Sequence, residues 1–479
     1  MKTLKRLEGS KQVWFVIFSS FLFFILRLPS LFEPLWYGDE GIYQVIGTSL
    51  NHGKMLYSQI FDNKPPLLYW VYAIFQSDQF TIRLVSLIFG LLSVIVFFLL
   101  SKKLFQNKRG NSNIPYLTTF VFTMSFGLPF LEGNIANAEN FMLLPIIASA
   151  LLLIDKKKFF LPGLLLGIAF LFKIVAIFDL AAFAVFCFIL NFDSLKKELK
   201  LSSLIAGFIL PIFLVSMFFL INGSLMDFIR ATFLSNISYV SYGNQIGKLP
   251  ILLFIKLILL GGFLLYLFIK RKAISETSLF ILIWFAFSLF NTFFSQRPYT
   301  HYVLVLISSL SLLIGLIFFD KTYRKVIIIV FILALFVVVK EFGINASTKS
   351  LRYYQNFLSY IEGKKTTTQY QAFFDKNTPF DYEIARFIKP NLGKNDTIFI
   401  WGNNAQLYQL VGVVAPTKYI VAYHITNYKD GESTTQQGIE KAKPKFIVIM
   451  PNSGPFPLPL INYSIKININ NVSIYERIF

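Results

Sequence analysis

The sequence predicts a polytopic α-helical membrane protein that ends in a small α/β domain. Of its 479 residues, 55% are hydrophobic and 15% are charged, whereas soluble domains carry about 25% charged residues. Long apolar runs recur along the chain, for example at 13–26, 80–100 and 201–220, and a run of roughly 18 residues is long enough to cross the hydrocarbon layer of a bilayer. After residue 340 the apolar runs shorten to strand length, which indicates a separate portion of the chain.

The basic residues give the predicted topology. The formal net charge is +20, but lysine and arginine lie in short clusters between apolar runs, whereas a nucleic-acid-binding surface needs a continuous basic face. We therefore expect no nucleic-acid partner, and we place the clusters in the cytoplasm by the positive-inside rule. The clusters lie at 2–11, 102–109, 156–158, 196–200, 270–272 and 321–325.

All of these clusters can face the cytoplasm only if 159–190 forms two short helices that turn near Lys173. The count is then about eleven transmembrane helices, with the N-terminus in the cytoplasm and the C-terminus outside. Residues 1–11 and the apolar run after them resemble a signal peptide, but the segment at Arg27 is not a small-residue cleavage site. We expect an uncleaved, multi-pass protein, integral to a bacterial plasma membrane.

The chain is expected to divide near residue 340. Residues 1–340 form the membrane portion, in which 33–78 is a long first outer loop with amphipathic helices. Residues 341–479 form an extracytoplasmic soluble domain. The shorter outer loops are expected at 132–138, 222–250 (with Tyr239 and Tyr242) and 295–301.

The C-terminal domain shows alternating strand and helix patterns. Asp396–Trp401 and Phe446–Met450 are short apolar runs typical of buried strands. Phe380–Lys389 has a helical pattern, which Pro390 ends. This alternation predicts a small α/β domain.

Two adjacent carboxylates occur in the first outer loop. Asp39 and Glu40 follow Gly38, and they suit the N-terminus of a helix predicted for 40–51, because negative charge is favoured there. That helix is amphipathic and is expected to lie flat on the membrane surface. Its apolar face contains Ile42, Val45, Ile46 and Leu50. A helix cap and a functional carboxylate both fit this pattern.

A lysine follows in the same loop, within Asp62-Asn63-Lys64-Pro65-Pro66. Proline is tolerated in the first turn of a helix, so the two prolines open an apolar helix at 65–76 and fix Lys64 at its start. A lysine held there could bind a phosphate as a point charge. It could equally extend its ammonium group to lipid headgroups.

These elements in this order resemble the GT-C superfamily of membrane glycosyltransferases, in particular the protein O-mannosyltransferases and the bacterial aminoarabinose-transferase-like proteins. The resemblance covers roughly 10–340 and is strongest in 34–95. It implies an inverting transfer of a sugar from a polyprenyl-phosphate donor to an acceptor hydroxyl at the outer face of the membrane. The acceptor could be a lipid, a cell-envelope glycan or a protein.

The resemblance also implies roles for residues along the chain. A positioned carboxylate can take the proton of the attacking hydroxyl, and fixed cations can stabilise the leaving phosphate. The implied catalytic residues are Asp39 and Glu139, and the implied phosphate-binding residues are Lys64, Lys173 and Arg297. The implied substrate-binding residues are Glu40, Tyr43, Asp62 and Tyr302, and His301 is a candidate metal ligand.

Some positions depart from the family pattern. Aminoarabinose-transferase-like proteins have a glutamate, which is a metal ligand, directly before the lysine of the Lys-Pro-Pro element, and this chain has Asn63 there. The cofactor is therefore left open, with a divalent metal as one option. The C-terminal domain does not resemble the MIR domain of eukaryotic mannosyltransferases, which weakens protein as the acceptor. His52 and His424 are expected at the surface.

A lipid or glycan transporter or flippase is the main alternative, and a scaffold whose outer domain binds a partner is a third. Transporters often contain inverted repeats and broken helices, whereas this sequence shows no repeat and its polar residues gather in the outer loops. The sequence identifies no partner for Asp179, and Cys187 is the only cysteine. Four glycines are interpreted as helix-packing residues: Gly127, Gly133, Gly163 and Gly167.

Overall fold

The computed structural model describes residues 2–105, 113–155, 158–190, 192, 197–237, 240, 244–245, 250–451 and 453–478. Parts of three predicted basic clusters, at 106–109, 156–157 and 196, lie outside the described residues, as do Tyr239 and Tyr242. The chain packs into two compact units, which are described separately. Unit 1 comprises Met1–Leu28, Leu84–Phe218 and Leu234–Leu351, and unit 2 comprises Pro29–Arg83, Phe219–Phe233 and Arg352–Phe479.

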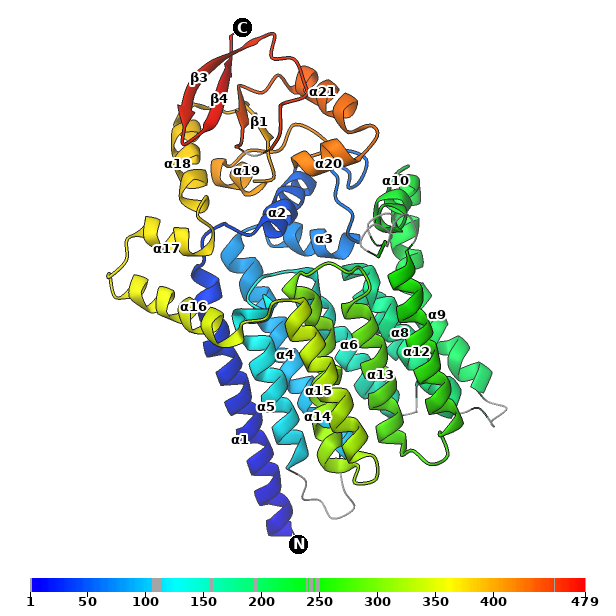
Figure 1. The fold of residues 1–479 in the computed structure, drawn as a ribbon. Coiled ribbons are helices and arrows are strands. Elements are labelled where there is room, and N and C mark those ends of the chain that lie inside the picture. Colours follow the sequence, from blue (N-terminus) through cyan, green and yellow to red (C-terminus); the bar gives the residue numbers. More distant parts are fainter. Residues whose placement is uncertain are drawn as a thin grey trace. The chain divides into compact units, whose positions relative to one another are not determined.

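Unit 1 consists of apolar helices that pack side by side (Figure 1). Among them α13 packs against both α8 and α14, and α6 packs against α7. The long helices of this part of the chain are α1 (Lys2–Arg27), α4 (Gln79–Phe105), α5 (Ile114–Gly127), α6 (Ala138–Ile154), α7 (Phe160–Phe172), α8 (Ile177–Leu190), α9 (Lys197–Ile221), α12 (Ile251–Ile269), α13 (Glu276–Thr292), α14 (Leu304–Phe319) and α15 (Arg324–Glu341). Short turns of helix, η2 (Pro129–Leu131), η3 (Ile174–Ala176) and η5 (Thr300–Val303), join some of them.

Several of these helices are suited to cross a membrane. In the described residues, 5 segments are long and apolar enough to span it. They are Ser10–Phe32, Gln79–Phe105, Lys200–Ile221, Ile251–Ile269 and Thr300–Phe319, and the shorter apolar helices are Ala138–Ile154, Phe160–Phe172, Ile174–Leu190 and Glu276–Thr292. The prediction of a polytopic α-helical membrane protein is confirmed, and the count of about eleven spans stays a prediction.

The predicted break near Lys173 is present. Helix α7 ends at Phe172 and α8 begins at Ile177, and Lys173 between them has extended backbone angles, with φ −155° and ψ 129°. The segment 159–190 therefore forms two short helices, as the basic clusters require.

Glycines allow α7 to approach α9 closely. A Cβ atom on Gly163 would lie 2.0 Å from the carbonyl oxygen of Leu204, and one on Gly167 would lie 2.4 Å from that of Phe208. In return, a Cβ atom on Gly207 would lie 2.0 Å from the carbonyl oxygen of Phe160. Any larger residue would push the helices apart, so the interpretation of Gly163 and Gly167 as packing residues is confirmed.

Asp179 has a partner that the sequence did not identify. The indole Nε1 of Trp284, on α13, donates a hydrogen bond of 2.8 Å to Oδ1 of Asp179, on α8. Both side chains are buried. The carboxyl group is thus satisfied inside the helix bundle, where an unpaired polar group would be costly.

Unit 2 combines the first outer loop with the C-terminal part of the chain. The loop contributes α2 (Gly38–Asn51) and α3 (Pro66–Ile74), close to the predicted helices at 40–51 and 65–76. Ile42, Val45 and Ile46 of α2 are buried. The remaining helices are α10 (Leu225–Ile229), α16 (Ala346–Ile361), α17 (Thr367–Phe374), α18 (Thr378–Ile388), α19 (Gln406–Val411), α20 (Ala422–Asn427) and α21 (Gly431–Ala442), with the short turns η1 (Leu28–Phe32), η4 (Arg230–Leu234) and η6 (Lys389–Asn391).

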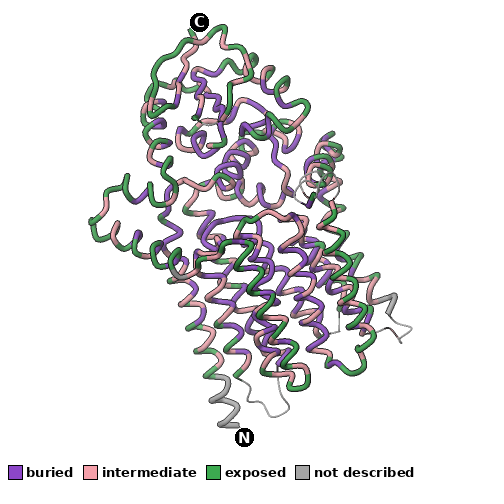
Figure 2. Tube along the Cα trace, in the orientation of Figure 1, coloured by how far each residue is buried: buried purple, intermediate pink, exposed green. Residues whose placement is uncertain are grey.

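A four-stranded sheet forms the core of the C-terminal part, in the order β1-β2-β4-β3. Strands β1 (Ile398–Trp401) and β2 (Phe446–Ile449) match the two predicted strands, pair in parallel and are almost fully buried (Figure 2). Strands β3 (Tyr463–Ile469) and β4 (Val472–Arg477) form an antiparallel hairpin that the sequence analysis did not predict. Helix α18 corresponds to the helix predicted for 380–389. The predicted small α/β domain is confirmed.

Direct contacts join the first loop to the C-terminal part. The backbone N–H of Phe61 donates to the carbonyl oxygen of Lys418 at 3.0 Å, and the Thr48 hydroxyl donates to Gln409 at 3.2 Å. Gly41 lies so close to the backbone of Gln406 that a Cβ atom would be 2.7 Å from its nitrogen. The first loop and the C-terminal part therefore pack as one unit, and the domain boundary predicted at 340 stays a prediction.

Candidate functional site

Asp39 lies in the first turn of α2 and is bonded to two other predicted site residues. Its Oδ2 accepts a hydrogen bond of 3.0 Å from the Tyr43 hydroxyl, one turn further along the helix. The same oxygen lies 3.4 Å from Nζ of Lys64. The side chain of Asp39 remains 35% exposed, so it is partly accessible to solvent.

Lys64 is held by its backbone as well as by its charge. Its carbonyl oxygen accepts a hydrogen bond of 2.7 Å from the Tyr57 hydroxyl, and its N–H donates a hydrogen bond of 3.2 Å to the Tyr69 hydroxyl. Pro65 and α3 follow directly, so the chain direction after the lysine is fixed. Nζ lies 4.8 Å from the centre of the Tyr43 ring. These contacts anchor Lys64 beside Asp39.

Asp62 is a second, buried carboxylate next to Lys64. Its Oδ2 accepts a hydrogen bond of 2.7 Å from the Tyr69 hydroxyl and lies 3.9 Å from Nζ of Lys64. Burial and the charge of Asp62 raise the pKa of Tyr69 well above its usual value, so the hydroxyl remains a donor. Two carboxylates therefore flank one lysine.

His424 also belongs to this group, which corrects the expectation that it lies at the surface. It is 2% exposed, and its Nε2 lies 3.6 Å from Oδ1 of Asp62. Burial lowers its pKa to about 4, although the charge of Asp62 raises it. No local sequence pattern indicates this position, because α20 reaches Asp62 only through the long-range packing of the C-terminal part on the first loop. His52 is exposed, as expected.

Glu40 faces a different set of residues. Arg83 donates to both of its carboxylate oxygens, at 3.1 and 2.5 Å. Arg83 also forms an ion pair of 2.8 Å with Glu33, and Glu33 accepts a hydrogen bond of 2.5 Å from the Tyr353 hydroxyl. Glu40 and Arg83 are both buried. This geometry makes Glu40 a counterion of Arg83, and its predicted role in substrate binding stays a prediction.

In unit 1, Glu139 and Lys173 form a buried ion pair. Glu139 lies in the first turn of α6, which Asn137 caps by accepting from the N–H of Ala138 at 2.9 Å. Glu139 is 0% exposed, and one of its oxygens accepts a hydrogen bond from Lys173. Its other oxygen has no hydrogen-bond partner among the described residues. Nζ of Lys173 lies 4.4 Å from the centre of the Tyr302 ring, so three predicted residues lie together.

His301 bridges this pair to a residue that the sequence analysis missed. Its Nδ1 lies 2.9 Å from Glu132, and its Nε2 lies 3.9 Å from Glu139. Burial alone would raise the pKa of Glu132, but hydrogen bonds from His301 and Thr300 and the charge of Lys349 lower it to about 2. Glu132 begins the predicted loop 132–138, and its place there was the only available signal. Arg297 lies half-buried between α13 and η5.

The described residues do not form an evident metal site. No group of three or more His, Cys, Asp or Glu side chains within them is arranged to hold a metal ion. The carboxylate oxygen of Glu139 that lies closest to His301 is the one bonded to the ammonium group of Lys173. The positive charge of Lys173 opposes the approach of a cation to that oxygen. The arrangement around His301 therefore gives no support for a resident metal within the described residues, and metal ligation by His301 stays a prediction.

Comparisons with known proteins agree with this architecture. Residues 63–219 match the family model described as dolichyl-phosphate-mannose-protein mannosyltransferase. The fold is similar to the crystal structure of ArnT from Cupriavidus metallidurans bound to undecaprenyl phosphate, with a TM-score of 0.57, 14% identity and 97% of each chain covered. It is also similar to apo ArnT from that organism, with a TM-score of 0.59, 13% identity and 98% of each chain covered. No curated protein matches the chain.

Proposed function

Because the chain has the fold of the GT-C membrane glycosyltransferases, of the aminoarabinose-transferase-like type, we propose that it moves a sugar from a polyprenyl-phosphate donor to an acceptor hydroxyl. The ArnT structure with undecaprenyl phosphate supports a lipid-phosphate donor. The observation that carries the proposal is the pairing of Asp39 with Lys64 at 3.4 Å in the first loop. We place the reaction at the outer face of a bacterial plasma membrane.

Asp39 acts as the general base in this proposal. The acceptor oxygen forms a bond to the anomeric carbon as the bond from that carbon to the phosphate oxygen breaks, and the configuration inverts. The proton of the acceptor hydroxyl passes to Asp39, and the electron pair leaves with the lipid phosphate. The hydrogen bond from Tyr43 orients the carboxylate, and the side chain of Asp39 is 35% exposed.

Lys64 stabilises the negative charge that grows on the leaving phosphate. Its anchored position means that little reorganisation is needed when the bond breaks, which is the condition for strong electrostatic catalysis. Lys173 and Arg297 are proposed as further phosphate-binding cations, and Tyr302 as a substrate contact. Glu139 is proposed to orient Lys173, to which it is bonded.

The substitution Asp39→Asn tests the proposal. Purified full-length protein is supplied with a polyprenyl-phosphate sugar and cell-envelope glycans, and transfer is followed by mass spectrometry. Loss of the base should reduce the rate by about 10² to 10⁴. Asp78→Asn is the matched control, because Asp78 is exposed and caps α4 through the N–H of Thr81 at 2.8 Å, a role that asparagine can also fill.

Two results would oppose the proposal. Folded Asp39→Asn protein that transfers sugar at the wild-type rate removes Asp39 as the base. Movement of the intact donor lipid across vesicle membranes, with no sugar transferred to any acceptor, favours the transporter or flippase. Donors that carry different sugars, supplied in the same assay, identify the sugar that is moved.

A further inference from the structure

Helix α16 carries a row of exposed apolar side chains. Leu351, Leu358 and Ile361 have exposed fractions of 59%, 55% and 63%. At 3.6 residues per turn, the three lie within an arc of roughly 80° around the helix axis, so together they form one apolar stripe. Contiguous exposed apolar surface usually marks a place where a partner or a membrane binds. The stripe therefore raises the question of what covers it.

The apolar stripe is one of three different faces of α16. On one side of it lie Arg352 and Gln355, which are exposed. On the other side lie Tyr353 and Phe357, which are buried. A helix with an exposed apolar face beside a polar face is typical of a helix that lies in the plane of a membrane surface.

The buried face of α16 contacts the ends of two membrane-spanning segments. The ring centre of Phe357 lies 5.9 Å from that of Phe32, which in turn lies 6.2 Å from that of Phe80. Phe32 is the last residue of the apolar segment Ser10–Phe32, and Phe80 is the second residue of Gln79–Phe105. All three rings belong to unit 2. Helix α16 therefore lies at the level where these two segments end.

The apolar stripe continues the exposed apolar surface of those segments. Phe32 and Phe80 are 52% and 46% exposed, and the stripe residue Leu358 directly follows Phe357, which packs on Phe32. The bilayer covers the exposed apolar side chains of membrane-spanning segments. It can cover the stripe as well without any further component.

Helix α16 cannot turn to bury the stripe, because bonds fix its orientation. The Tyr353 hydroxyl donates to Glu33 at 2.5 Å. Tyr370, on α17, stacks on Tyr360 with ring centres 4.2 Å apart, and its hydroxyl donates to the carbonyl oxygen of Phe32 at 3.4 Å. The first loop and α17 thus hold two sides of the helix and leave the stripe on the outside.

The charge of this segment complements phospholipid headgroups. Residues 346–365 contain four basic side chains and one acidic one. Arg352 is exposed on the polar face, and the side chain of Lys364, just beyond the helix, is 71% exposed. Basic side chains beside an apolar stripe can meet the phosphates while the stripe enters the acyl chains.

We propose that α16 is an interfacial helix whose apolar stripe inserts into the phospholipid bilayer, with Arg352 and Lys364 at the level of the headgroup phosphates. Residues 346–361 then belong to the membrane surface and not to the soluble domain expected for 341–479. Because Tyr353 is bonded to Glu33 at the start of the first loop, this contact also holds the loop at a fixed depth. The inference goes beyond the proposed function and does not depend on sugar transfer.

The depth of spin labels in full-length protein tests this proposal. Cys187 is the only cysteine, so Cys187→Ala gives a background for single labels in nanodiscs of phosphatidylethanolamine and phosphatidylglycerol. Electron paramagnetic resonance then compares the access of oxygen, which enriches in lipid, with that of a water-soluble nickel complex. The substitutions, all at exposed positions, are Leu351→Cys, Leu358→Cys and Ile361→Cys in the stripe and Arg352→Cys and Gln355→Cys on the polar face.

Labels in the stripe should lie about 5–10 Å below the phosphates. The label at Arg352 should lie at the phosphate level, and the label at Gln355, the matched control three residues before Leu358, should lie at or above it. Unfolding temperatures close to that of the unlabelled Cys187→Ala protein confirm that each labelled variant is folded.

Two results overturn the proposal. If nickel reaches the labels at Leu358 and Ile361 as readily as the label at Gln355, the stripe faces water. If neither oxygen nor nickel reaches the labels in the stripe, protein covers it instead of lipid. Dipolar broadening between the labels of two molecules would then identify a second copy of this chain as the occupant.

Discussion

The Nε2 atom of His424 lies 3.6 Å from Oδ1 of Asp62. The other oxygen of Asp62 accepts from Tyr69 and lies 3.9 Å from Nζ of Lys64. A side chain from α20 thus supports the carboxylate that neighbours the proposed phosphate-binding lysine. The C-terminal part of the chain therefore helps to hold the first loop in place.

The buried position of His424 predicts a loss of stability in acid. Its pKa falls from 6.5 to about 4 because of burial, so the folded protein binds the proton less readily than the unfolded chain does. The stability that this group contributes is complete above its unfolded pKa of 6.5. It is lost as the pH falls from 6.5 toward 4, by at most about 3 kcal/mol. Thermal unfolding measured near neutral pH and at about pH 5 should show this loss in wild type and a smaller one in His424→Gln.

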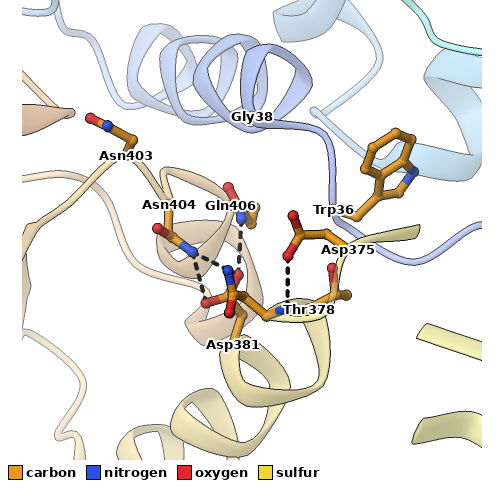
Figure 3. A pocket seen from close by; sticks show the side chains of 9 residues that line it. Trp36, Gly38, Asp375, Thr378, Asp381, Asn403, Asn404 and Gln406 are labelled. Atoms are coloured by element: carbon orange, nitrogen blue, oxygen red, sulfur yellow. Dashed lines mark hydrogen bonds between the residues drawn. The ribbon is translucent and has the colours of Figure 1, made fainter. Parts of the chain in front are cut away.

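The comparison with His424→Gln isolates this histidine from other titrating groups. Asp381, which lines a polar cavity beside Gly38 (Figure 3), acts in the opposite sense, because burial raises its pKa to about 6. Its contribution to stability is present at low pH and is lost as the pH rises from 3.8 to about 6. Asp381 is the same in both proteins, so it cancels in the difference. An identical acid dependence in wild type and His424→Gln would contradict the predicted role of His424.

Removing the charge of Lys64 should impair transfer more than folding. Lys64→Gln leaves Asp39 and Asp62 without the cation between them and removes the proposed stabilisation of the leaving phosphate. The ratio kcat/KM should fall by about 10² to 10³. Lys64→Arg keeps the charge and should recover part of the rate, whereas a role in contacting lipid headgroups would leave both variants near wild-type activity.

Much of the fold followed from local sequence patterns. The helix break at Lys173, helices α2 and α3, and strands β1 and β2 all lie close to their predicted positions, because each depends on periodicity, proline or charge within a short window. Asp39 and Lys64 were also singled out from the sequence of one loop, and the structure shows that they lie 3.4 Å apart. The sequence analysis missed the hairpin of β3 and β4, although β3 alternates apolar and polar residues from Tyr463 to Ile469 and this alternation was an available signal.

Contacts between distant segments could not be read from the sequence. His424 meets Asp62, Glu33 meets Arg83, and Trp284 meets Asp179 only after the chain has folded. Each of these pairs joins residues on different elements, and no periodicity within one element encodes such a partner. The polar cavity was missed for the same reason, since its lining combines the first loop with residues around β1.

The close approach of α2 to α19 predicts that Gly41→Ala is destabilising. The added Cβ atom would lie 2.7 Å from the backbone nitrogen of Gln406 and 3.1 Å from its Cα. Backbone atoms cannot move aside as a flexible side chain can, so the two helices must separate, at a cost of about 1–3 kcal/mol. The loss should appear as a lower unfolding temperature.

Gly38→Ala is the matched control for that experiment. It lies in the same helix, and an added Cβ atom there meets nothing within 4 Å. The free energy of unfolding should change by no more than about ±0.5 kcal/mol, which is the range of ordinary surface substitutions. Equal destabilisation by the two alanines would contradict the role of the contact with Gln406, because alanine has a higher helix propensity than glycine and propensity alone would stabilise both variants.

The network of Glu33, Arg83 and Glu40 decides between two roles for Glu40. Arg83→Met should cost about 3–5 kcal/mol, because it leaves two carboxylates buried without their cation. If Glu40 acts only as a counterion, combining Arg83→Met with Glu33→Gln and Glu40→Gln should restore most of that stability and leave the acceptor KM unchanged. If the triple variant regains its stability but its acceptor KM rises tenfold or more, Glu40 instead takes part in binding the substrate. No return of stability would show that the hydrogen bond from Arg83 to the Ser30 carbonyl, at 2.7 Å, matters more than the two ion pairs.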